Sequence, residues 1–404
     1  MLGAAILLIS LVVAACSAVL SPSPVRPLAS LSTASATPLV TPTAAPTFDL
    51  AQVKVVALHA LAVDGDVIYG DQHIAGSSKY DFVAYNLSTG ATRDLGTAAS
   101  AATVSDGRVV WTTYTVENGA PPGGIPGCSP SSVAHWRLYR FSPSDAKPSL
   151  VAKGDSVRPG LGECADSMAP LIALDGDSVA YTDGLGSGDT ITVLDVRSGR
   201  RTRTIATSGV VDELAISNGS IAYLEEVQDR TPDFAPFDNQ LMLAGASGAP
   251  TVVAEHANWF SMAGARVAWM SSGTTTGVVS IEVLPSSSTT YPPNPYSSTE
   301  VDPSILWEDT DPWASLVVVS PDAVAWSWPS DRSSIAYWRD GHVGTCLIPT
   351  PGASGVDLVY PIAIGTRWLV WIDRPDVMPD VSEMWQDDND PNTYAAPVME
   401  LTCP

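Results

Sequence analysis

Two segments of the chain combine carboxylates with tryptophan, and these are the residue types best suited to chemistry in this sequence. They cover residues 300–313 and 373–394. A tryptophan ring stacks on the apolar face of a sugar, and carboxylates accept hydrogen bonds from its hydroxyl groups. Together the two segments form the candidate ligand-binding site. Its residues are Trp307, Glu308, Asp309, Asp311, Trp313, Trp385, Asp387, Asp388 and Asp390.

Catalysis needs a more specific arrangement than these segments show. Glycoside hydrolysis uses two carboxylates that flank the scissile bond, and no pair here stands out as such a dyad. The chain also lacks the G-x-S-x-G and H-E-x-x-H motifs. We therefore assign no catalytic residue and favour a binding protein. An exported carbohydrate- or peptide-active enzyme with carboxylate catalysis in the same loops is the alternative.

A calcium ion is the one cofactor for which the sequence shows candidate ligands. Asp388, Asp390 and Asn392 place oxygen atoms at alternate positions, as at the beginning of a calcium-binding loop, because hard cations take several oxygen ligands. Thr393 stands where such a loop usually has glycine. We expect a solvated acidic loop without a cofactor, and Ca²⁺ is the alternative.

The charge of the chain restricts its partners. It has 43 acidic and 20 basic residues, for a formal net charge of −23. Nucleic acids require lysine and arginine for phosphate neutralisation, so they are excluded as partners. We expect a monomer that binds an envelope or extracellular protein, a peptide or a glycan.

The elements that position these segments are indicated by a short pattern that occurs seven times. Each copy has an apolar or small triplet, a turn and a second apolar run that ends in an aromatic residue. Repeats of roughly 40–50 residues with β-strand content are typical of propellers. We predict an all-β fold, a seven-bladed β-propeller over residues 48–404. The aromatic residues are Tyr69, Trp111, Tyr181, Tyr223, Trp269, Trp326 and Trp371.

Turn signals support this count in most copies. Asp-Gly or Asn-Gly between two apolar runs is a strong hairpin signal. The copies that end at Trp269 and Trp326 lack it, so six blades plus an irregular one is the alternative. The four dipeptides are Asp64-Gly65, Asp106-Gly107, Asp175-Gly176 and Asn218-Gly219.

The seventh copy has no outer strand of its own. Its third strand is predicted at 398–401, and few residues follow it. The apolar segment 52–56 precedes the first copy and has no blade. We expect this segment to become the outer strand of blade seven, which closes the ring and covers an exposed edge.

The best-preserved copies pair 175–181 with 191–199, and 64–69 with 83–90. Their pattern resembles the TolB-like and WD40-like propeller repeats of bacterial envelope proteins. The resemblance covers residues from about 50 to 404 and concerns the architecture. It implies a propeller that works as an envelope interaction platform, and it assigns no catalytic residue.

The N-terminal segment indicates export. Residues 2–15 are almost wholly apolar and too short to span a bilayer. They end in Val-Ala-Ala before Cys16, which resembles the lipobox of bacterial lipoproteins, although no Lys or Arg precedes the cysteine. That resemblance implies a signal peptide over 1–15, lipidation of Cys16 and attachment to the extracytoplasmic face of the cell membrane. Residues 16–47 are rich in Pro, Ser, Thr and Ala and are expected to be a disordered tether. A signal peptide cut elsewhere, or an uncleaved anchor, is the alternative.

Four further cysteines are an even number in a chain predicted to be exported, so disulfides are expected. Cys128 and Cys164 lie in two loops of blade two that emerge on one face of a propeller. Cys346 begins the outer strand of blade six, and Cys403 follows the third strand of blade seven. We predict Cys128–Cys164 and Cys346–Cys403 pairs, with four free thiols as the alternative.

Loop length differs between the two faces of the predicted ring. The short turns fall on one face, and the long insertions are all assigned to the other. Long loops on one rim of a rigid scaffold are the usual place for a site, so we expect binding through that face. The insertions are 115–134, 153–170, 225–238, 286–313 and 373–394.

Overall fold

A computed structural model describes most of the chain after residue 49. The described residues are 50–77, 79–117, 133–157, 169–182, 190–226, 239–272, 279–284, 305–309, 316–327, 334–340, 346–351, 358–374, 392–398 and 401. Residues 45–404 belong to one compact unit.

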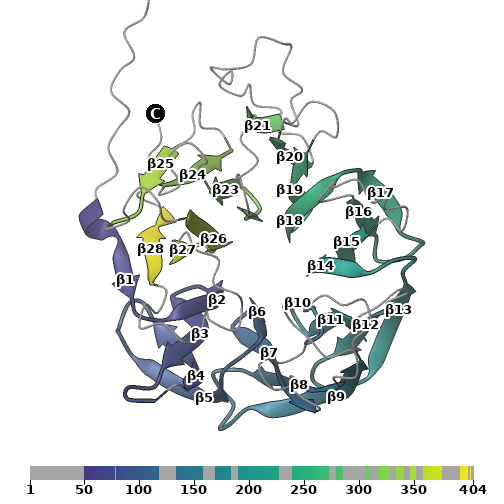
Figure 1. Cartoon of the computed structure of the whole chain (residues 1–404), viewed down its shortest axis with the longest axis horizontal. Coiled ribbons are helices and arrows are strands. Elements are labelled where there is room, and N and C mark those ends of the chain that lie inside the picture. Colours follow the sequence, from purple (N-terminus) through teal and green to yellow (C-terminus); the bar gives the residue numbers. More distant parts are fainter. Residues whose placement is uncertain are drawn as a thin grey trace, which may run out of the picture. The chain divides into compact units, whose positions relative to one another are not determined.

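The described residues form seven antiparallel sheets of four strands each, arranged around a central axis as a β-propeller (Figure 1). The inner strands are β2 (His59–Asp64), β6 (Ala101–Ser105), β10 (Ile172–Asp175), β14 (Val211–Ser217), β18 (Ala257–Ala263), β22 (Val317–Val319) and β26 (Leu358–Ile364). The second strands are β3 (Val67–His73), β7 (Arg108–Glu117), β11 (Ser178–Thr182), β15 (Ser220–Glu226), β19 (Arg266–Ser272), β23 (Ala323–Ser327) and β27 (Trp368–Arg374).

Each blade is completed by a third and an outer strand. The third strands are β4 (Tyr80–Asn86), β8 (Val133–Phe141), β12 (Thr190–Asp195), β16 (Asn239–Ala244), β20 (Val279–Leu284), β24 (Ser334–Arg339) and β28 (Thr393–Pro397). The outer strands are β5 (Thr92–Thr97), β9 (Ser149–Val157), β13 (Arg201–Ala206), β17 (Thr251–Ala254), β21 (Ile305–Asp309), β25 (Cys346–Pro349) and β1 (Lys54–Val56), and a 3₁₀ turn at Leu50–Gln52 precedes β1. Seven regular blades confirm the predicted count over the six-plus-one alternative.

The repeat aromatics form the core between blades. Apolar side chains of each pair of neighbouring blades make one cluster, and seven such clusters are found around the described ring. All seven repeat aromatics are buried; Trp371 is 0% exposed and Tyr181, the most exposed of them, 5%. Because every cluster is shared between two blades, no blade has a core of its own.

The N-terminal strand closes the ring, as predicted. β1 pairs with β28, with Lys54 opposite Ala395 and Val56 opposite Thr393. The Thr393 hydroxyl is buried, donates to the Leu58 carbonyl at 2.6 Å and accepts from the Ala60 amide at 3.1 Å. These bonds connect blade seven to the chain that enters blade one.

The predicted third strand of blade seven was wrong. The strand is Thr393–Pro397, and residues 398–401 follow it. Ala395 and Ala396 are fully buried in two different clusters, so small side chains are needed there. Val398 and Leu401 pack into the core between blades six and seven without being part of the sheet.

Candidate functional site

The hairpin turns between inner and second strands define one face of the ring, called here the turn face. A polar side chain at the end of an inner strand accepts a hydrogen bond from the turn of the next blade. Ser105 Oγ accepts from the Gly176 amide at 2.9 Å, and Ser217 Oγ accepts from the Gly264 amide at 2.9 Å. Asp64 and Gly107 make the same contact.

Ion pairs add to these links on the turn face. Arg266 pairs with Asp340 of the next blade at 2.6 Å. Between blades seven and one, the Trp368 indole donates to Asp66 at 2.8 Å, and Arg367 pairs with the same carboxylate. The indole is the main reason that the pKa of Asp66 is lowered. The polar groups of this face thus hold blades together.

The opposite face, called here the loop face, carries the connections from second to third strands and from blade to blade. The sequence analysis assigned the whole insertion 286–313 to this face, and that was wrong for its first part. Residues 285–304 connect β20 to β21, and connections from a third to an outer strand belong to the turn face. Residues 305–309 are also not loop but the outer strand of blade five. Their apolar beginning, Ile305-Leu306-Trp307, is compatible with pairing to β20.

Acidic side chains fix the connections of the loop face. Asp71, Glu225 and Asp373 each follow a repeat aromatic by two positions. Glu225 is buried and accepts from the Ser208 hydroxyl at 2.9 Å and from the Gly209 amide at 2.7 Å. A Cβ on Gly209 would lie 2.3 Å from a backbone oxygen, so glycine is needed for this approach.

Asp373 plays the same part in blade seven. Its carboxylate accepts from the Asn392 amide at 2.7 Å and from the Tyr394 hydroxyl at 2.7 Å. The Asn392 side-chain amide also donates to it at 3.4 Å. Asn392, a predicted calcium ligand, is therefore tied to the base of its loop.

Asp71 differs because one of its oxygens has no partner among the described residues. The side chain is 2% exposed, and Oδ1 accepts from the Ala99 amide at 3.0 Å. Oδ2 is buried without a hydrogen bond there. Burial raises the pKa of Asp71 to about 7, against the opposing effect of the Ala99 amide.

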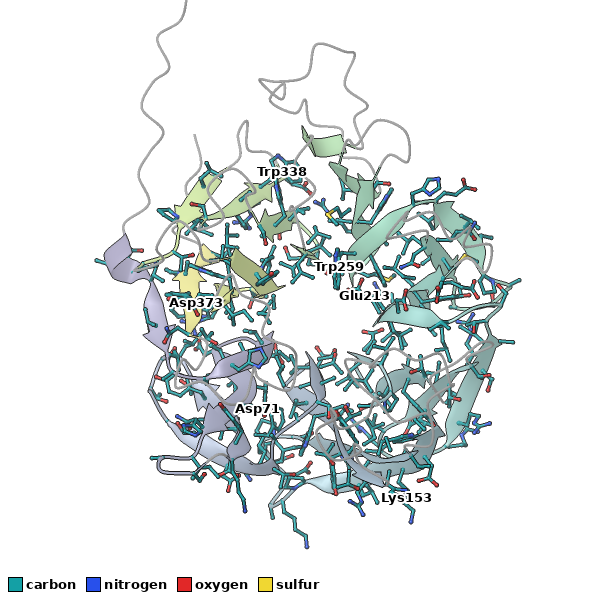
Figure 2. All side chains as sticks on the ribbon, viewed as in Figure 1. Asp71, Lys153, Glu213, Trp259, Trp338 and Asp373 are labelled. Carbon is teal, nitrogen blue, oxygen red and sulfur yellow. The ribbon has the colours of Figure 1, made fainter. Side chains whose placement is uncertain are left out.

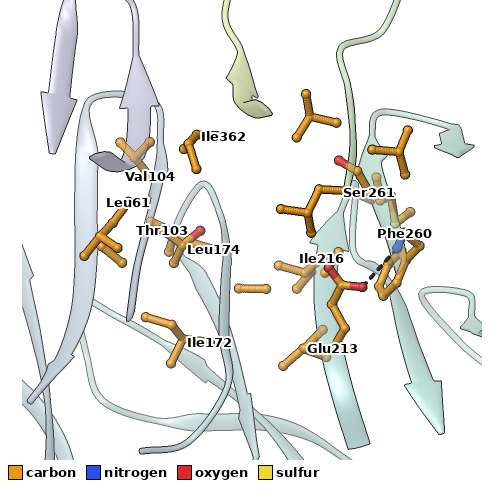
Figure 3. Close-up of a pocket in the computed structure, with 18 of the residues that line it drawn as sticks. Leu61, Thr103, Val104, Ile172, Leu174, Glu213, Ile216, Phe260, Ser261 and Ile362 are labelled. Carbon is orange, nitrogen blue, oxygen red and sulfur yellow. Dashed lines mark hydrogen bonds between the residues drawn. The ribbon is translucent and has the colours of Figure 1, made fainter. Parts of the chain in front are cut away.

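A cavity of about 480 Å³ lies along the propeller axis and is lined by all seven inner strands (Figure 3). Its wall has polar as well as apolar surface, and half-buried aliphatic side chains such as Leu61, Ile172, Leu316 and Ile362 face it. Such a volume is in the range of small-ligand sites. We refer to it as the axial channel.

Among the described residues, Glu213 is the one ionisable residue in the lining of the axial channel. It lies near the beginning of β14, at the loop-face end, and a register irregularity at Asp212 precedes it. One carboxylate oxygen accepts from the Phe260 amide of the next blade at 2.9 Å (Figure 3). Burial raises the pKa of Glu213 to about 8; the Phe260 amide opposes this shift and the charge of Asp212 adds to it.

Trp259 is seen near the central opening in the view of Figure 2. It precedes Phe260 on β18, also toward the loop face, and is 38% exposed, which is unusual for so large an apolar side chain in this ring.

Most of the predicted site residues cannot be compared with this geometry. Trp307, Glu308 and Asp309 lie on β21, and Asp309 is opposite Val279, which places it at the loop-face end of the strand. Outside the described residues lie Asp311, Trp313, Trp385, Asp387, Asp388 and Asp390. Within the described ranges, no group of three or more His, Cys, Asp or Glu side chains could hold a metal ion.

The cysteines are described only in part. Cys346 is the first residue of β25, as expected, and is disulfide-bonded. Its partner is not among the described residues, so the pairing with Cys403 stays a prediction. Cys16, Cys128 and Cys164 are outside these ranges as well.

Sequence reasoning missed Glu213 and Asp71. A signal existed for Asp71, because the position two residues after the repeat aromatic is acidic in four copies, at Asp71, Asp183, Glu225 and Asp373. Nothing comparable identifies Glu213, since its role depends on the ring bringing seven inner strands together.

Comparison with solved structures supports the fold. The propeller domain of the trilobed protease from Pyrococcus furiosus, which has an open velcro topology, superposes with a TM-score of 0.50 at 10% identity, covering 80% of this chain and 91% of that one. Acylaminoacyl peptidase from Pyrococcus horikoshii gives 0.52 at 12% identity over 79% of this chain, which spans half of the peptidase. Oligogalacturonate lyase in complex with manganese gives 0.50 at 10% identity, with coverages of 85% and 90%.

At these identities the likeness extends to the fold alone. No protein-family profile and no curated protein matches the sequence. Among the described residues, no helix has the length and apolar character needed to cross a bilayer.

Proposed function

We propose that this chain is an extracytoplasmic lipoprotein whose propeller serves as a binding platform for a protein, peptide or glycan through its loop face. The observation that supports this most directly is the difference between the faces. On the turn face, the polar side chains described above bond from blade to blade. The loop face holds the end of the axial channel at which Glu213 lies, together with most of the long connections.

Rigidity of the platform follows from its construction. Seven shared cores, the turn-face bonds and the closure by β1 all join neighbouring blades. Loops on such a scaffold can present a site without ordering the whole molecule when a partner binds, which reduces the entropic cost of association.

The platform proposal is tested by comparing variants of the two faces. Affinity capture from envelope extracts and a glycan array should identify a ligand for the full chain. We expect its binding to be lost in the triple variant Trp385→Ala, Asp388→Asn, Asp390→Asn. It should persist in Arg197→Ala, which alters an exposed side chain of the turn face. Loss of binding in the turn-face variant alone would contradict the proposal.

Membrane attachment through Cys16 is a separate part of the proposal, supported by the lipobox-like sequence that ends at this residue. Replacing Cys16 with Ser should move the protein from the membrane fraction to the soluble extracytoplasmic fraction, or leave its precursor unprocessed. Fractionation with immunoblotting checks this, with Cys128→Ser as the matched control. Unchanged partitioning of the Cys16→Ser protein into detergent would contradict lipidation.

A further inference from the structure

We propose that the axial channel binds a primary ammonium group carried on an apolar stem, with the Glu213 carboxylate as its counter-ion at the loop face. The inference deepens the proposed function by naming a ligand chemistry for the loop face. It rests on the proposed function only for the choice of that face. It does not use the acidic segments at 300–313 and 373–394.

The aliphatic side chains of the channel wall favour a ligand with an apolar stem. The half-buried aliphatic side chains of Leu61, Ile172, Leu316 and Ile362 face a space that is large enough for a small ligand. Covering them removes apolar surface from water, which favours binding.

The Glu213 carboxylate favours a ligand with a cationic head group. Its hydrogen bond from the Phe260 amide fixes the carboxyl, and this is its one hydrogen bond among the described residues, so the other oxygen remains available. Ser261, another polar residue of the wall, already accepts from the Val319 amide at 3.2 Å. Among the described residues, no cationic side chain lines the channel. The described wall therefore offers an anionic ligand no charged partner, whereas an ammonium group would pair with the ionised form of Glu213.

The environment of Glu213 predicts that ligand binding is coupled to release of a proton. Its pKa of about 8 reflects burial and the neighbouring charge of Asp212, with the Phe260 amide acting in the opposite direction. Near pH 7 the free carboxyl is therefore mostly protonated. A bound ammonium favours the ionised form, so binding at this pH should release a proton.

Calorimetry with hexylammonium chloride tests the site in the full chain. Hexylammonium should bind at least tenfold more tightly than 1-hexanol, which has the same stem without the charge. Shortening the stem to butylammonium should weaken binding, by about fourfold for each fully buried methylene. Titration at pH 7 in buffers of different ionisation enthalpy should show release of close to one proton.

Two variants separate the site from general charge attraction. Glu213→Gln keeps an acceptor for the Phe260 amide but removes the charge, and should abolish both the preference over 1-hexanol and the proton release. Asp212→Asn removes a neighbouring exposed charge outside the lining and should change affinity less than threefold. The proposal is overturned if wild-type protein shows no preference for hexylammonium, if Glu213→Gln retains it, or if no proton is released. Each result is independent of whether the loop face has a macromolecular partner.

Discussion

At the scale of single residues, Asp71 couples folding to pH. Its pKa of about 7 in the folded chain lies above the ordinary value of 3.8 because the carboxyl is buried. Between these values the unfolded chain has released a proton that the folded chain still holds. Stability contributed by this group is therefore complete below pH 4, decreases as the pH rises to about 7 and remains lost above it.

Replacing Asp71 with Asn should remove this dependence, since the amide retains an acceptor for Ala99 and cannot ionise. One pKa unit corresponds to about 1.4 kcal/mol, so wild-type protein should lose a few kcal/mol relative to the variant between pH 4.5 and pH 8. Urea unfolding at both pH values measures the difference, with Asp94→Asn on the exposed strand β5 as control. A wild-type-to-variant difference that does not change with pH would contradict this assignment.

Residue identity alone could not predict these environments. Asp71, Glu225 and Asp373 occupy the same position of the repeat. Glu225 and Asp373 accept several hydrogen bonds, whereas one oxygen of Asp71 has no partner among the described residues. The difference arises from the connections that approach each acid. Those connections vary in length and sequence, so the repeat pattern contains no information about them.

At the scale of elements, local pattern predicted most strands and failed where two patterns competed. Residues 398–401 are mostly large apolar side chains, whereas Thr393–Pro397 is rich in small residues and ends in a proline. The third strand of blade seven is Thr393–Pro397 because the Thr393 hydroxyl donates a hydrogen bond to the Leu58 carbonyl and two small side chains, Ala395 and Ala396, fit between packed blades. β21 was not predicted because Ile305–Asp309 runs directly into an acidic segment that was interpreted as a loop.

The C-terminal residues after β28 provide a prediction at this scale. Cys346 and Leu401 belong to the same core cluster, and Cys403 is two residues further along the chain. We expect a Cys346–Cys403 disulfide, and mass spectrometry of a non-reduced digest should show the linked peptides. Cys403→Ser should lower the melting temperature under oxidising conditions, while Cys128→Ser should leave this linkage intact. Linkage of Cys346 to any other cysteine would contradict the prediction.

At the scale of the whole molecule, the repeat period and the need to close a ring were sufficient to predict seven blades and the role of β1. The axial channel was not predictable in the same way. Its lining takes a few residues from each of seven strands that are distant in sequence. Each inner strand by itself is an ordinary apolar strand, so a single acid such as Glu213 becomes significant only after closure.

Closure itself can be tested by removing residues 48–58. This deletion takes away β1, leaves the edge of β28 unpaired, and removes the Leu58 carbonyl that accepts from Thr393. Each lost hydrogen bond costs about 1 kcal/mol, and the buried side chains of Val56 and Leu58 are lost as well. Since neighbouring blades share their cores, the melting temperature of the entire ring should fall in one cooperative transition. Removing the equally long segment 34–44 should have no such effect, and an unchanged melting temperature after deletion of 48–58 would show that β1 does not hold the ring closed.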